Sequence, residues 1–280
     1  MIELSNELLT VQVNPFGAEL TSVRSASGTE YLWQAQEPWN RHAPILFPIV
    51  GRLKEHRYTY RDKTYELNQH GFARDRMFDV VESSNDRVVF QLRPDAETQN
   101  CYPFEFVFEV IYELDNESLI QSFVVKNTSE TQSLPASFGA HPAFHAAMGW
   151  RLVFDEDETV NSDILEGGVL TQEWRTGIVN GELELTPELF EQDALIFRNL
   201  NSRSVTLENA QGQSRVMVRF DEFPFLGIWA KPAAPFVCIE PWQGIADSWF
   251  SSGILEEKEG ILNIGPGQEV LKTMSMAFYS

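Results

Sequence analysis

The strongest constraint on the fold is an alternation of apolar and acidic residues in the segment FEFVFEVIYEL, residues 104–114. Phenylalanine, valine, tyrosine and leucine side chains fall on one face of this segment, and three glutamates fall on the other. A period of two is typical of a β-strand with one buried and one solvated face. The segment therefore predicts a strand of a half-solvated antiparallel sheet.

Comparable short runs recur along the chain, with turn-forming residues between them. Further strands are expected in LLTVQV, RVVFQL, LIQSFVV, SVTLEN, RVMVRF and TMSMAFY. Tight hairpins are predicted at residues 56–67 and 204–220. Helical signals are few, and a short helix is expected at residues 186–195, where Thr186 precedes a proline at the first helical position. The pattern predicts an all-β chain: one large antiparallel β-sandwich with a few short helices, forming a single domain over residues 1–280.

Charge and composition narrow the classes of partner. The formal net charge of −20 argues against binding to nucleic acid or to anionic membrane surfaces, because both partners need a positively charged protein surface. No apolar run approaches the ~20 residues of a membrane span, and the N-terminus lacks the basic start and apolar core of a secretory signal. Cys101 and Cys238 are far apart in apolar settings, so two buried thiols and a cytoplasmic location are expected.

Four stretches interrupt the alternation, and functional residues tend to lie where local rules are broken. These stretches are APILFPIVGRLKEH, LNQHGFARDR, SFGAHPAFH and FVCIEPWQGIADSWF. His141 and Glu240 each precede a proline, which restricts them to extended backbone conformations. Both are therefore expected at strand ends.

Each candidate residue has a structural interpretation beside the functional one. His141 could be a turn residue whose ring nitrogens satisfy nearby carbonyls, and Glu240 a buried carboxylate paired with an arginine. Arg52 and Arg74 could be salt-bridge partners, and Trp229 a core residue. Their combination in one β scaffold favours sugar binding, because aromatic rings and planar polar groups fit the apolar and hydroxyl faces of a sugar.

Neither a metal nor a cofactor is expected. His141 and His145 are four residues apart, a spacing that forms half of a metal site only on a helix, and Pro142 argues against a helix there. The chain also lacks a Gly-x-Ser-x-Gly elbow, a phosphate-binding glycine loop and a dinucleotide fingerprint.

At these stretches the chain resembles the aldose 1-epimerase (galactose mutarotase) family, and within it the LacX-like branch near the hexose-6-phosphate 1-epimerases. The resemblance rests on six motifs in the family's order: NPFGAELTSVRSASGTEYLW, FPIVGR, QHGFAR, FGAHPAF, FEQDALIF and CIEPWQG. It implies a large antiparallel β-sandwich and chemistry that uses neither cofactor nor metal.

The resemblance also implies a role for individual residues. His141 of GAHPAF corresponds to the general acid, and Glu240 of CIEPW to the general base. Apolar neighbours are expected to raise the pKa of Glu240, and nearby carboxylates to raise that of His141. Trp229 is expected to offer an aromatic surface to the sugar. The other matched positions are expected to contact substrate, namely Arg52, Gln69, His70, Arg74 and Asp193.

Together these observations predict an aldose 1-epimerase that interconverts the α and β anomers of an aldohexose by acid–base ring opening and closure. One alternative is a hexose-6-phosphate 1-epimerase, with Arg52 and Arg74 holding the phosphate. Others are a non-catalytic carbohydrate-binding protein, or a glycoside hydrolase that pairs Glu240 with Asp193 or Asp247. The expected partner is a small sugar or sugar phosphate, bound by a monomer or a homodimer.

Overall fold

The computed structural model describes residues 1–279, and strands dominate them. About 51% of the residues are in strands and about 6% in helices, and the sheets are antiparallel. The predicted all-β class and antiparallel architecture are confirmed. Two large sheets and three small ones account for the strands.

The larger sheet has nine strands. In spatial order these are β17 (Glu182–Glu184), β14 (Arg151–Phe154), β19 (Ser204–Glu208), β20 (Ser214–Arg219), β24 (Glu269–Phe278), β10 (Ser118–Asn127), β9 (Phe106–Asp115), β8 (Arg87–Leu92) and β7 (Asp79–Ser83). The second sheet has eight strands: β16 (Val169–Ile178), β15 (Val160–Glu166), β18 (Leu195–Arg198), β21 (Phe225–Trp229), β22 (Phe236–Gln243), β12 (Phe138–Ala140) and β4 (Ile45–Leu46), with β13 (Ala143–His145) paired to β22.

The small sheets and the helices complete the chain. The sheets are β1 (Ile2–Ser5) with β2 (Leu9–Asn14) and β3 (Glu19–Ser25), β5 (Arg57–Tyr60) with β6 (Lys63–Glu66), and β11 (Leu134–Ala136) with β23 (Leu262–Ile264). The helices are α1 (Ala96–Cys101) and the 3-10 turns η1 (Lys54–His56), η2 (Ala73–Asp75), η3 (Glu188–Phe190) and η4 (Leu255–Glu257). Within residues 1–279, no helix has the length and apolar character needed to cross a membrane.

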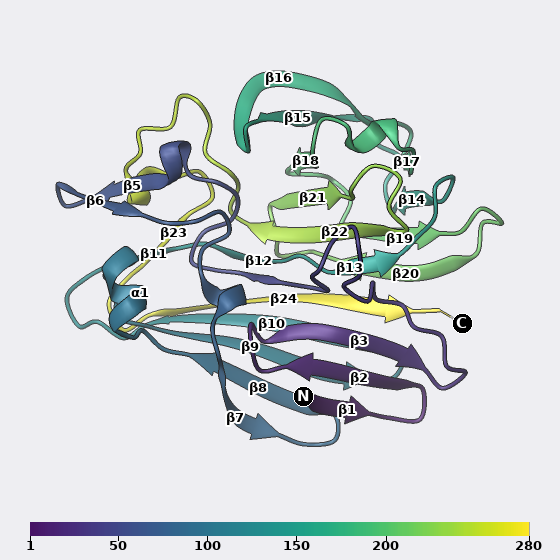
Figure 1. Ribbon diagram of the computed structural model, residues 1–280, viewed down its shortest axis with the longest axis horizontal. Helices are drawn as coiled ribbons and strands as arrows, with labels where there is room; N and C mark the ends of the chain where they lie inside the picture. Colours follow the sequence, from purple (N-terminus) through teal and green to yellow (C-terminus); the bar gives the residue numbers. More distant parts are fainter. Residues whose placement is uncertain (280) are drawn as a thin grey trace.

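Aromatic side chains pack the two large sheets face to face. The ring of Phe47, just after β4, stacks on that of Phe108 in β9 with centroids 4.2 Å apart. Phe138 of β12 lies 5.6 Å from Phe123 of β10, again measured between ring centroids. In Figure 1, β8, β9, β10 and β24 cross the lower half of the view, and β15, β16, β18 and β21 lie in the upper half. This aromatic layer stabilises the sandwich by removing large apolar surfaces from water.

The alternation at residues 104–114 forms β9, as predicted. Its even-numbered residues from Phe106 to Leu114 are buried, whereas Glu105 and Glu113 are exposed. The two predicted hairpins are also present, as β5–β6 and β19–β20. Here the local pattern is enough, because a strand pair with one buried face has only one favourable register.

The helix expected at residues 186–195 is only the single 3-10 turn η3, Glu188–Phe190. Asp193 takes a left-handed conformation with φ 67°, which ends the turn and directs the chain into β18. The helix that does form, α1, was not predicted. It begins after Asp95, whose side chain accepts the backbone N–H of Thr98 at 2.7 Å in a capping box.

Strand β22 of the eight-stranded sheet is buried on both of its faces, and this positions the site. On β22, Val237 and Ile239 belong to the main core between the sheets. Trp242 belongs to a second apolar cluster on the outer face, together with Ile196 and Ala246. Because side chains alternate along a strand, Glu240 points to the same outer face as Trp242.

Candidate active site

A cavity of about 210 Å³ opens on the outer face of the eight-stranded sheet. Its lining includes every residue predicted for the site except Arg52, namely Gln69, His70, Arg74, His141, Asp193, Trp229 and Glu240. These residues come from strands β21 and β22, the turn between β12 and β13, and the segments after β6 and η3. Ile196, Trp242 and Ala246 of the second apolar cluster form part of the same wall.

Strand register brings His141 and Glu240 together. Gly139 of β12 and Ala143 of β13 pair with the positions two residues on either side of Glu240 in β22. His141 lies in the turn between them and is therefore directly opposite Glu240. Directly opposed residues in antiparallel strands place their side chains on the same face. His141 Nε2 lies 3.2 Å from Glu240 Oε2.

Aromatic rings enclose the imidazole of His141. Trp39 stacks on it with centroids 5.2 Å apart, and Trp229 presents an edge at 5.8 Å. Burial among these rings lowers the pKa of His141 to about 3, and the positive charges of Arg74 and Arg41 act in the same direction. The expectation that nearby carboxylates raise the pKa of His141 is wrong, because desolvation of the imidazolium is the largest effect and the charges that act on the ring are those of arginines.

The carboxyl group of Glu240 is shifted in the opposite direction. Only 1% of its side chain is exposed, and burial raises its pKa well above the usual range. The negative charge of Asp193 adds to this effect. The raised pKa that the sequence analysis expected for Glu240 is thus found in the structure. Burial therefore favours the neutral form of both members of the His141–Glu240 pair.

His70 is held as a neutral hydrogen-bond donor. Its Nδ1 accepts the backbone N–H of Gly51 at 3.1 Å, and burial lowers its pKa well below the usual range. With Nδ1 acting as an acceptor, the single ring proton is on Nε2. The amide of Gln69 lies 3.2 Å from that nitrogen, an arrangement that favours its oxygen facing the ring.

Three arginines differ in their access to the cavity. Arg74 lines it and donates to the Gln69 carbonyl at 2.9 Å. Arg41 also lines it and donates to Asp75 at 2.9 Å. Arg52 does not line the cavity. Its guanidinium donates to the carbonyl of Gly167 at 2.5 Å, so it supports the β15–β16 turn that borders the cavity.

Unsatisfied polar atoms concentrate at this cavity. Within residues 1–279, seven buried side-chain nitrogen or oxygen atoms have no hydrogen-bond partner. Five of them belong to residues that line or border the cavity, namely Arg52 Nε, Arg74 Nε, His141 Nδ1, Glu240 Oε2 and Trp242 Nε1. Buried polar atoms are otherwise nearly always paired, so this concentration indicates a site built for a polar ligand.

The sequence did not reveal Trp39 and Arg41. Both lie in the long segment between β3 and β4, where no strand pattern continues. A long irregular segment containing the cluster EPWNRH is itself a signal, since binding residues are frequent in such loops. Trp242 of the CIEPW motif also lines the cavity and was not among the predicted site residues. Its indole lies over Gly227 of β21, where a Cβ atom would be 2.5 Å from the ring.

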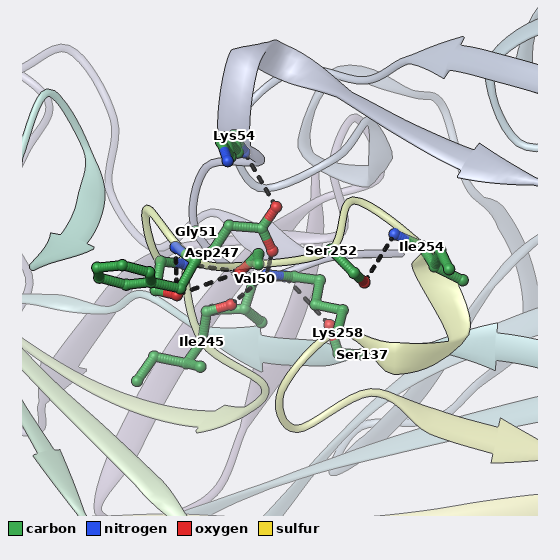
Figure 2. A network of polar contacts seen from close by, with 12 residues as sticks. Val50, Gly51, Lys54, Ser137, Ile245, Asp247, Ser252, Ile254 and Lys258 are labelled. Carbon is green, nitrogen blue, oxygen red and sulfur yellow. Dashed lines mark hydrogen bonds and ion pairs between the residues drawn. The ribbon is translucent and has the colours of Figure 1, made fainter.

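A buried ion pair fixes the wall behind the cavity (Figure 2). Lys258 Nζ lies 2.9 Å from Asp247 Oδ1 and donates to the Ile245 carbonyl at 2.5 Å. The other carboxylate oxygen of Asp247 accepts the backbone N–H of Lys54 at 3.0 Å, and the Asp247 N–H donates to the Arg52 carbonyl at 2.9 Å. Asp247 does not line the cavity, so the structure gives no support to its pairing with Glu240 in a glycoside hydrolase.

The only residues described that could share a metal ion are His141, Cys238 and Glu240, whose ligand atoms all lie within 4.8 Å of one another. His145 is outside this group, and its ring instead contacts Trp33 at 5.9 Å between centroids. The sequence argument against a His141–His145 pair therefore agrees with the structure.

Residues 1–259 of the chain match the sequence model of a protein family described as "Aldose 1-epimerase". The plasmid and chromosomal LacX proteins of Lactococcus lactis subsp. lactis are 36% identical to it over 283 residues, covering 95% of each chain. A galactose mutarotase related enzyme from Lactobacillus acidophilus superposes with a TM-score of 0.95 at 36% identity, over 99% of this chain and 97% of that one.

A galactose mutarotase-like protein from Lactobacillus casei is 29% identical, with a TM-score of 0.93 and full coverage of both chains. The sequence match and the shared architecture agree over almost the whole length. The chain belongs to the aldose 1-epimerase family.

Proposed function

We propose that the protein is an aldose 1-epimerase that interconverts the α and β anomers of an aldohexose, with His141 and Glu240 as its acid–base pair. The observation that carries this proposal is the geometry of that pair. An imidazole and a carboxyl group lie 3.2 Å apart at the floor of a sugar-sized cavity, and each has an unsatisfied polar atom. Family membership supports an isomerase of this type.

Anomer exchange needs two proton transfers and no net consumption of protons. Transfer of the shared proton from Glu240 to His141 across their 3.2 Å contact first gives the reactive carboxylate and imidazolium. Glu240 then takes the proton of the C1 hydroxyl while His141 delivers its proton to the ring oxygen, and the bond between C1 and the ring oxygen breaks. The resulting aldehyde rotates about its bond to C2. Reversal of both transfers closes the ring on the other face. One proton shared by the pair is therefore sufficient for a complete cycle.

The remaining lining residues suit the sugar itself. Neutral His70 offers an Nε2–H donor, Asp193 offers a carboxylate acceptor, and Trp39 and Trp229 offer apolar ring surfaces. Flat rings and directional polar groups together match the two kinds of surface that a pyranose presents.

Polarimetry of freshly dissolved α-glucose, α-galactose and glucose 6-phosphate tests the proposal directly. With protein and EDTA present, optical rotation of at least one of these sugars is expected to reach equilibrium much faster than without protein. Incubation with an aryl glycoside should release no phenol. Rates equal to the spontaneous ones for all three sugars would contradict the proposed function.

The pair is expected to work over a wider pH range than free side chains would allow. Reference pKa values of about 4.3 and 6.5 would leave one proton on the pair only between those limits. Here His141 takes up a second proton only near pH 3, because its pKa is lowered. Glu240 gives up the last proton only well above pH 4.5, because its pKa is raised. The two steps belong to the pair as a unit.

The polarimetric kcat/KM should therefore not fall as the pH is lowered through about 4.3, where an ordinary carboxylate takes up its proton, and should drop only closer to pH 3. Circular dichroism at each pH checks that the protein remains folded. A rate that follows the ordinary titration of a carboxylate or an imidazole across this range would contradict the shifted pair.

The arginines favour a second candidate substrate, a hexose 6-phosphate. Arg41 and Arg74 both line the cavity of a protein whose net charge is −20, and Arg74 Nε has no hydrogen-bond partner among the residues described. Cations placed in so acidic a chain can offset repulsion of an anionic substrate. Arg52 was expected to contact the phosphate. It borders the cavity and supports the β15–β16 turn, so we assign it an indirect role in phosphate binding.

If a phosphate is bound here, Arg74→Gln should raise the KM for glucose 6-phosphate by about 10- to 100-fold and change that for glucose far less. A charge-assisted hydrogen bond is worth roughly 1.5–3 kcal/mol, which corresponds to this range. Arg61→Gln, on the exposed β5–β6 turn, is the matched control and should change neither value. Equal losses for both sugars would favour the neutral aldohexose.

A further inference from the structure

Cys238 lies beside the proposed acid–base pair, although the proposed reaction does not use it. It precedes Glu240 by two residues on β22, so both side chains are on the same face of the strand. The thiol is fully buried. Its sulfur, a nitrogen of His141 and a carboxylate oxygen of Glu240 all lie within 4.8 Å of one another.

We propose that His141, Cys238 and Glu240 form a binding site for a thiophilic divalent cation of the Zn²⁺ type, and that such a cation reversibly blocks the cavity. Thiolate, imidazole and carboxylate are the three ligand types that Zn²⁺ takes in proteins. Its bond lengths place neighbouring ligand atoms roughly 3.3–3.6 Å apart in a tetrahedron. The histidine and glutamate atoms are already 3.2 Å apart, so a shift of about 1 Å is sufficient to bring in the sulfur.

The unpaired atoms of the site support the same conclusion. Glu240 Oε2 is buried and has no hydrogen-bond partner among residues 1–279, so this oxygen has a lone pair available to an ion. His141 and Glu240 both face the cavity, which gives the ion a route in and leaves its fourth position open to water. Three protein ligands with one open position are typical of accessible zinc sites.

Binding would release protons and would compete with the proposed reaction. The thiol proton leaves as the sulfur–metal bond forms, and the proton shared by His141 and Glu240 leaves as both become ligands. About two protons should therefore enter the buffer for each ion bound. The ion would occupy the acid and the base together, so zinc should act as an inhibitor and EDTA should restore activity.

Cobalt(II) is the probe of choice, because a thiolate ligand gives it a near-ultraviolet charge-transfer band that does not depend on enzymatic activity. The chain has only two cysteines, so the Cys101→Ala variant leaves Cys238 as its one thiol. That variant and the unaltered protein should both show the band at one cobalt per chain. Cys238→Ala should lack it and should bind Zn²⁺ more than about 100-fold more weakly, since even outer-shell partners are worth about 10–100-fold.

Inhibition by zinc can be measured only if the proposed function is correct, whereas the cobalt spectrum does not depend on that function. If the protein shows no mutarotation, the cobalt band still decides whether the site exists. Absence of the band from the Cys101→Ala protein at saturating cobalt would overturn the proposal, and this result does not require the Cys238→Ala variant to fold. A band that persists in folded Cys238→Ala protein would also overturn it.

Discussion

Replacing His141 by Asn or Glu240 by Gln is expected to slow mutarotation by about 10²–10⁴-fold, because a positioned acid or base contributes this much to a proton-transfer step. Both replacements are close in size to the original side chain, and neither new group can transfer the required proton. Circular dichroism should show a folded protein, and tryptophan fluorescence should still report sugar binding, since Trp39 and Trp229 line the cavity.

The double variant tests whether the two groups act as a unit. If each depends on the other, His141→Asn combined with Glu240→Gln should be about as slow as either single variant. His145→Asn is the matched control, because His145 lies in the same segment but does not line the cavity. Near-full activity in either folded single variant would remove that residue from the proposed mechanism.

The second large effect is expected from the ion pair behind the cavity. Replacing only one member, as in Lys258→Met or Asp247→Leu, should lower the free energy of unfolding by about 3–5 kcal/mol. The exposed fractions of the two side chains are 2% and 4%, so the remaining charge would be buried without its partner. The backbone contacts of Asp247 to Arg52 and Lys54 would also lose their anchor.

Urea denaturation measures this loss, and two controls define it. The double variant Lys258→Met with Asp247→Leu should recover much of the stability, because no isolated charge is left. Arg219→Ala, which removes an exposed pair with Asp221, should change the free energy of unfolding by less than about 1 kcal/mol. A loss for the buried pair no larger than that for the exposed pair would show that the network has no anchoring role.

The positions of the long strands of the nine-stranded sheet, such as β8, β9 and β10, could be predicted from the sequence, because they depend on local rules. Alternation in segments such as β9, and turn residues in hairpins such as β5–β6, specify which face of a strand is buried. Local rules gave the wrong prediction of a helix at residues 186–195, where only one 3-10 turn forms. Ten residues with one capping signal do not form a stable helix alone, and the left-handed backbone of Asp193 ends the segment before β18.

The candidate site shows the same division. The sequence identified His141 and Glu240 from their motifs, but it did not place them in contact. Its expectation of a strand end is wrong for Glu240, which lies inside β22. Their contact depends on the pairing of β12 and β13 with β22, which are about a hundred residues apart in the chain. Trp39 and Arg41 join the cavity through a loop whose course no local pattern specifies.

The sequence by itself determined the strands with clear alternation, the order of the motifs and the types of reacting group, because these follow from nearest-neighbour sterics and side-chain chemistry. Only the tertiary structure decided the protonation of the pair. A pKa depends on how completely a group is removed from water, and the packing of Trp39 and Trp229 around His141 lowers its pKa instead of raising it. Desolvation is a property of the assembled fold, and the sign of the shift at His141 could not be predicted from its neighbours in the sequence.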